Sequence, residues 1–242
     1  MRIGLDHTSE IGVRAGRLLL GEPDLALLGI LRRDTKDPET RLRRIDDLSD
    51  VDVVVTDDPG STILDEAIKA GTTAVLWDDG ADIEDDPDGA GVLKGANLVA
   101  GIGRSLLARE WAISGGAGDA VLAWTEPGRP LRHGEPVTFP DPVGARWGRR
   151  RGRSQRPLEI AAPVPDEWAG ILVRTSGADG SRTVAIADLN THLEAIALAA
   201  GAIVAACGLV PAGVHTPDEY AEEYLLAALR IGLDIASFTE VS

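Results

Sequence analysis

Short apolar runs alternate with amphipathic segments through the first 113 residues, and this alternation constrains the fold more than any other feature of the chain. The runs predict strands at residues 2–5, 25–31, 51–56 and 72–77, with helices over residues 11–20, 62–70 and 98–113. The apolar residues of the first helix recur at positions 11, 15, 18 and 19, on one helical face. Buried strands that alternate with helices are joined by right-handed crossovers. The sequence therefore predicts an α/β unit with a parallel sheet over residues 1–113.

The second half has a different pattern. Between about residues 119 and 188, short β-like runs are separated by proline and glycine, which is typical of a mainly antiparallel sheet. A long helix is predicted to follow over the stretch "NTHLEAIALAAGAIVAACG", with Thr191 and Glu194 at the spacing of a capping box. A last helix is predicted over about residues 216–231. We expect residues 114–242 to form an α+β domain for substrate binding and dimerisation.

Composition narrows the class of protein. The formal net charge is −15, which repels nucleic-acid phosphates, so no nucleic-acid partner is expected. No run of 18 apolar residues occurs, so no membrane span is predicted. The single cysteine, Cys207, cannot form an intrachain disulfide, which fits a reducing compartment and a cytoplasmic location.

The first predicted turn lies where dinucleotide-binding proteins carry G-x-G-x-x-G, but here it reads "DHTSEIG". Asp6 and Ser9 replace two glycines, while Gly12 remains for helix–strand packing. A carboxylate about 5 Å from a pyrophosphate costs about 1–3 kcal/mol, which weakens binding without excluding it. His7, Thr8 and Ser9 are candidate cofactor contacts, because hydroxyl and imidazole groups at a helix N-terminus donate to phosphates. If the cofactor has been lost, Asp6 is expected to close the turn and cap the helix near Ser9.

Three stretches resemble the dihydrodipicolinate reductase, homoserine dehydrogenase and saccharopine dehydrogenase group of oxidoreductases. They read "RIGLDHTSEIGVRAGRLL", "DVDVVVTDDPGSTILDEAIKAGTTAVLW" and "GANLVAGIGRSLL". The last stretch resembles the start of the family's domain-linking helix, for which Asn97 is a suitable N-cap. The resemblance implies an N-terminal Rossmann-type parallel sheet, an α+β domain with a mainly antiparallel sheet, and an NAD(P)-dependent activity of the amino-acid metabolism type.

The resemblance also indicates which cofactor to expect. Where NAD-preferring members carry an acidic residue after the second strand, this chain has Arg32 and Arg33. Arginine there favours a 2′-phosphate, so the expected cofactor is NADP. Thr56, at the end of the third predicted strand, is a further candidate contact. The His-His pair and lysine of dihydrodipicolinate reductase have no counterpart in "AISGGAGDAVLAWTEPG".

Catalytic residues are therefore unassigned, with His192 and His215 as candidates from their positions at helix starts. No histidine, cysteine or acidic residue occurs at a metal-ligand spacing, so no metal is expected. The acidic stretch at residues 77–89 is interpreted as a solvated loop. The arginine-rich stretch at residues 146–156 is interpreted as a surface hairpin or as a phosphate or subunit contact.

Three hypotheses remain open at this point. The chain is an NADP-dependent oxidoreductase with a small-molecule substrate, a catalytically silent Rossmann-fold binding or regulatory protein that has lost the dinucleotide, or a structural homodimer whose antiparallel sheets pair across a two-fold axis. A homodimer is expected under each of them.

Overall fold

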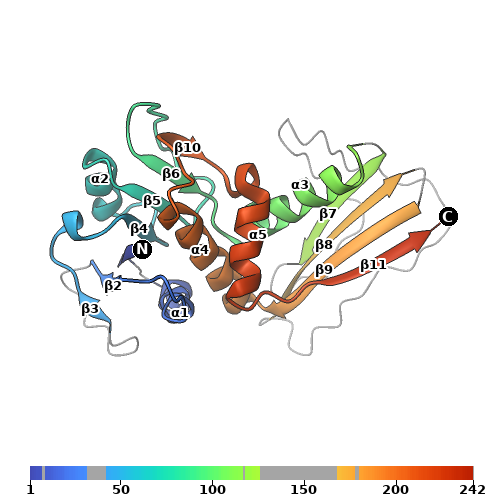
Figure 1. The fold of residues 1–242 in the computed structure, drawn as a ribbon, viewed down its shortest axis with the longest axis horizontal. Helices are drawn as coiled ribbons and strands as arrows, with labels where there is room; N and C mark the ends of the chain where they lie inside the picture. The colour runs from blue at the N-terminus through green and yellow to red at the C-terminus, as the bar shows by residue number, and fades with distance from the viewer. Residues whose placement is uncertain (7–8, 32–41, 117, 126–167, 178–179, 242) are drawn as a thin grey trace.

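The protein contains two separate β-sheets linked by helices (Figure 1). The computed structural model describes residues 1–6, 9–31, 42–116, 118–125, 168–177 and 180–241. One sheet is parallel and the other is antiparallel, which confirms the predicted fold class.

The parallel sheet is built mainly from the first half of the chain. Its seven strands lie in the order β10-β6-β5-β4-β1-β2-β3. They are β1 (Arg2–Asp6), β2 (Leu27–Ile30), β3 (Arg43–Arg44), β4 (Val53–Thr56), β5 (Thr73–Leu76), β6 (Gly91–Lys94) and β10 (Gly213–His215). The strand order reverses at β1, so β2 lies on one side of it and β4 on the other. In such sheets ligands bind beyond the carboxyl ends of the strands at this reversal.

Helices α1 (Glu10–Leu19), α2 (Thr62–Lys69) and α4 (Asn190–Ala206) cover the parallel sheet (Figure 1). Gly71, with φ of 73°, follows the end of α2 in the left-handed conformation that glycine adopts without strain. α4 packs along α1 and against β4 and β5. Its residues from Ala195 to Ala205 are all buried, as is usual for a helix that is apolar on every side.

A continuous helical segment leads from the first sheet to the second. It starts as a π-helical turn over Leu98–Gly103 and continues as α3 (Arg104–Ile113). The Asn97 side chain accepts a hydrogen bond from the Ala100 N–H at 2.8 Å, so the predicted N-cap is confirmed.

The antiparallel sheet has the strand order β11-β9-β8-β7. The strands are β7 (Asp119–Thr125), β8 (Trp168–Gly177), β9 (Gly180–Leu189) and β11 (Ala236–Val241). Leu122, Val173 and Val184 are paired across three strands and buried, on the face that packs against α3. The predicted β-runs at residues 135–139 and 158–162 lie outside the described residues.

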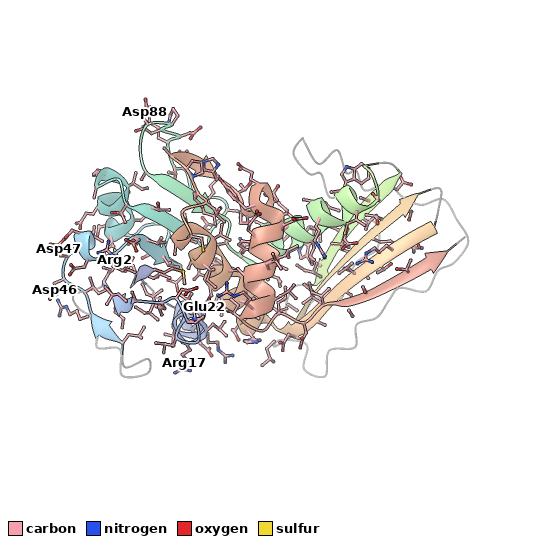
Figure 2. The ribbon with its side chains drawn as sticks, in the orientation of Figure 1. Arg2, Arg17, Glu22, Asp46, Asp47 and Asp88 are labelled. Atoms are coloured by element: carbon pink, nitrogen blue, oxygen red, sulfur yellow. The ribbon has the colours of Figure 1, made fainter. Side chains whose placement is uncertain are left out.

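After β9 the chain returns to the first sheet. α4 packs on that sheet, β10 pairs with β6 at its edge, and α5 (Ala221–Arg230) packs on α4 and α3. An ion pair between Arg230 and the buried Glu22 fastens α5 to the turn after α1. Figure 2 labels Glu22 in that turn. Residues 190–235, which we expected to belong with the second sheet, therefore contribute to the core of the first, because the apolar surface of α4 is buried there.

Candidate functional site: the carboxyl edge of the parallel sheet

The N-terminus of α1 lies at the reversal of strand order and is capped by Ser9. The Ser9 hydroxyl accepts a hydrogen bond from the Ile11 N–H at 3.1 Å. The Ser9 N–H and hydroxyl in turn donate to Asp57 Oδ2, at 3.0 and 2.6 Å. Asp57 directly follows β4, so these bonds connect the first turn to the neighbouring strand end. Gly12 is buried in the first turn of α1.

Asp6, which replaces the first glycine of the turn, is fully buried at the end of β1. Its carboxylate accepts a hydrogen bond from the Ser61 hydroxyl and lies 3.3 Å from Thr56 Oγ1. Ser61 is itself the N-cap of α2 and accepts from the Ile63 N–H at 3.1 Å. The expectation that Asp6 caps the first helix is corrected: Ser9 caps α1, and Asp6 bonds toward α2, because two hydroxyls face it from the next strand end and the next helix.

The remaining cofactor candidates are only partly described. Thr56 is buried, and its hydroxyl accepts the Asp58 N–H at 3.0 Å, so it stabilises the loop after β4 beside Ser9 and Asp57. His7, Thr8, Arg32 and Arg33 lie outside the described residues. The structure thus brings Ser9 and Thr56 to one edge of the sheet, and their contacts to a cofactor stay a prediction.

Glu194 joins three elements near the end of β5. Its Oε2 accepts hydrogen bonds from Trp77 Nε1 at 2.8 Å and from the Leu98 N–H at 2.9 Å. Burial raises the pKa of the Glu194 carboxyl, against the lowering effect of these two bonds. The predicted capping box of Thr191 with Glu194 is wrong: α4 begins at Asn190 with no side-chain cap, because the carboxylate is used in these tertiary bonds.

Tyr224 of α5 lies next to this junction and is fully buried. Its hydroxyl donates to the Ala197 carbonyl of α4 at 2.7 Å. Burial raises the pKa of Tyr224 well above its ordinary value, and the charge of Glu194 adds to this effect. Gly101 makes the close packing possible, since a Cβ there would lie 2.4 Å from the Tyr224 hydroxyl. No pattern in the sequence distinguished Tyr224, and Glu194 was distinguished only as a capping-box residue.

The two histidine candidates have local acidic partners. His192 Nε2 lies 3.8 Å from Asp188, four residues earlier. His215 Nδ1 lies 2.9 Å from Glu219, whose own carboxylate accepts the Thr216 N–H in a capping box. Burial raises the pKa of Glu219, but its bonds to His215 and Thr216 outweigh this and lower it overall. The contacts described for the two histidines are with Asp188, Glu219 and the Ala212 carbonyl, and none is with Ser9 or Thr56.

Acidic side chains of the stretch at residues 77–89 contact other elements of the fold. Asp85 Oδ1 accepts the Val214 N–H of β10 at 2.9 Å, and Asp79 lies 3.7 Å from Arg104 of α3. Within the described ranges, no three acidic, histidine or cysteine side chains are grouped to hold a metal ion. In the same ranges no helix is both long and apolar enough to cross a bilayer. The arginine-rich stretch at residues 146–156 lies outside the description.

The architecture is a two-domain fold with a Rossmann-type parallel sheet, and solved structures of a reductase and of dehydrogenases have the same fold. No protein-family model and no curated protein matches the sequence. Among solved structures, the chain is similar to dihydrodipicolinate reductase from Paenisporosarcina sp. TG-14, with dipicolinate bound, at a TM-score of 0.54 and 12% identity over 91% of this chain and 98% of that one. This confirms the predicted resemblance to the dihydrodipicolinate reductase group at the level of the fold.

Two further solved structures have the same architecture. The C. glutamicum DAP dehydrogenase in complex with DAP gives a TM-score of 0.56 at 14% identity, covering 91% of this chain and 95% of that one. An engineered D-amino acid dehydrogenase bound to NADP+ gives 0.51 at 16% identity with the same two coverages. Such low identities establish the fold, and function has to be argued from the site.

Proposed function

We propose that this chain is an NADP-dependent oxidoreductase that acts on a small amino-acid-like substrate. The observation that supports this best is the position of the α1 N-terminus, which lies at the reversal of strand order beside the end of β4. A helix N-terminus at that point has the positive end of the helix dipole, which favours a pyrophosphate. Hydride transfer is carried out by the cofactor, so the protein mainly has to bind and orient both reactants.

The preference for NADP rests on the sequence. Arg32 and Arg33 follow β2, where a guanidinium favours the 2′-phosphate over the free ribose hydroxyl. His7, Thr8, Ser9, Gly12 and Thr56 complete the proposed cofactor contacts. His192 and His215 are proposed as proton donors or acceptors, since an acidic side chain lies 3.8 Å from the first and 2.9 Å from the second.

Calorimetric titration of the full chain with NADPH and with NADH tests the proposal. We expect saturable binding of NADPH, with a dissociation constant lower than that for NADH. A panel of amino acids is then offered with NADP+, and reduced nicotinamide is followed by its absorbance. Absence of saturable binding of either nucleotide at millimolar concentration overturns the proposal.

A second candidate function is a silent binding or regulatory role without a dinucleotide. The buried Asp6 favours it, because this carboxylate stands where a glycine would let the pyrophosphate approach the backbone and is engaged with Ser61 and Thr56. The same titration separates the two functions, since this candidate predicts no nucleotide binding at any concentration reached.

We further propose that the chain is a homodimer that pairs through the antiparallel sheet. Strand residues alternate between the two faces, and Ala123, Leu172 and Ala185 lie paired on the face opposite to Leu122 and Val173, half-buried. Multi-angle light scattering is expected to give twice the chain mass of 25.4 kDa, and a monomer mass contradicts the proposal.

A further inference from the structure

The carboxylate of Asp57 lies where the proposed cofactor would place negative charge. Ser9, the N-cap of α1, donates both its N–H and its hydroxyl to Asp57 Oδ2, at 3.0 and 2.6 Å. In dinucleotide-binding proteins the positive end of this helix faces a phosphate of the ligand. Here a side chain of the protein itself supplies the anion.

The neighbouring acidic residue, Asp58, makes different hydrogen bonds from those of Asp57. Asp58 accepts the Gly60 N–H at 3.0 Å, and its own N–H donates to Thr56, so these bonds stabilise the loop after β4. Asp57 instead reaches across to Ser9, which is 48 residues away in sequence. Asp57 is half-buried and Ser9 is exposed, so a ligand from solvent reaches the pair.

We propose that Asp57 limits nucleotide affinity, because its carboxylate competes with the pyrophosphate for the N-terminus of α1. The inference rests on the proposed function, because it names the residue that limits how tightly the nucleotide is held. For a phosphate to contact Ser9, the Asp57 carboxylate has to leave it, or two negative charges come to lie within about 5 Å of each other. Repulsion at that distance corresponds to about tenfold to hundredfold in affinity.

The test compares NADPH binding by the full-length protein, the Asp57→Asn variant and the matched Asp58→Asn variant, by calorimetry at one ionic strength. Asparagine keeps an acceptor oxygen for Ser9 and removes the charge, so α1 stays capped. We expect the dissociation constant for NADPH to fall at least tenfold in Asp57→Asn. In Asp58→Asn we expect it to change less than threefold. Thermal unfolding of all three proteins, within a few degrees of each other, verifies that the fold is retained.

Each outcome is decisive. If Asp57→Asn and the unsubstituted protein bind NADPH with equal affinity, or if Asp58→Asn improves binding as much, the competition does not exist and the proposed function stands. If none of the three proteins binds NADPH or NADH, the proposed function fails and this inference fails with it. Should Asp57→Asn unfold, Asp57→Ser is used in its place, since it also removes the charge.

Discussion

Replacing Glu194 with alanine should destabilise the junction between the two sheets. The substitution leaves Trp77 Nε1 and the Leu98 N–H without the acceptor that they contact at 2.8 and 2.9 Å. Hydrogen bonds to a charged group contribute about 1.5–3 kcal/mol each, and relief from burying the charge offsets part of that sum. We expect a net loss of about 2–4 kcal/mol in the free energy of unfolding.

For a chain of this size that loss lowers the melting temperature by roughly 5–15 °C. The assay is urea and thermal unfolding of the unsubstituted protein, Glu194→Ala and the matched variant Glu194→Gln. Glutamine keeps an oxygen acceptor for both donors, so its stability should stay within about 1 kcal/mol of the unsubstituted protein. If the alanine variant is as stable as the unsubstituted protein, or if glutamine destabilises as much as alanine, the two bonds do not hold the junction.

Three further predictions concern stability. Because burial raises the pKa of Glu194 above its unfolded value of 4.5, the unsubstituted protein should lose stability relative to Glu194→Gln as the pH rises above 4.5, measured by urea unfolding at each pH. Gly101→Ala places a Cβ against the Tyr224 hydroxyl and should cost about 1–3 kcal/mol in thermal unfolding, with Tyr224→Phe in the same chain recovering part of the loss. Ser61→Ala removes both the N-cap of α2 and a donor to the buried Asp6, so it should cost about 2–3 kcal/mol in urea unfolding.

The outcomes that contradict these predictions are specific. If the difference in unfolding free energy between the unsubstituted protein and Glu194→Gln does not change with pH, the pKa of the Glu194 carboxyl is not raised. Failure of Tyr224→Phe to recover any stability in Gly101→Ala shows that the hydroxyl is not the obstacle. Thr62→Ala is the control for Ser61→Ala, since Thr62 is exposed at the next position, and equal losses in the two variants refute the capping role of Ser61.

The long periodic elements could be predicted from the sequence because their signals are local. The apolar face of α1 and the Asn97 cap each occupy a few consecutive residues, and the structure confirms both. β3 and β10 have two and three residues and carry no periodicity, so their pairing with distant strands could not be recognised. The packing of α4 on the first sheet also could not be recognised from a local pattern, because it depends on tertiary contacts of the apolar surface of α4.

The same distinction applies to the site. The sequence placed Ser9 at the α1 N-terminus as a phosphate contact and Asp6 as the cap, whereas Ser9 itself caps the helix in the structure. Its bond to Asp57 spans 48 residues and depends on β1 lying next to β4, which no local pattern specifies. Glu194 was misread for the related reason that its spacing from Thr191 fits a capping box, whereas Trp77 and Leu98, distant in sequence, provide its donors.

The most direct measurement of the central claim is a crystal structure of the protein grown with NADPH. The account predicts the pyrophosphate at the N-terminus of α1, within hydrogen-bond distance of Ser9, with the Asp57 carboxylate displaced from it. A nucleotide bound elsewhere on the fold, or crystals without nucleotide in which Ser9 still donates to Asp57, would contradict it.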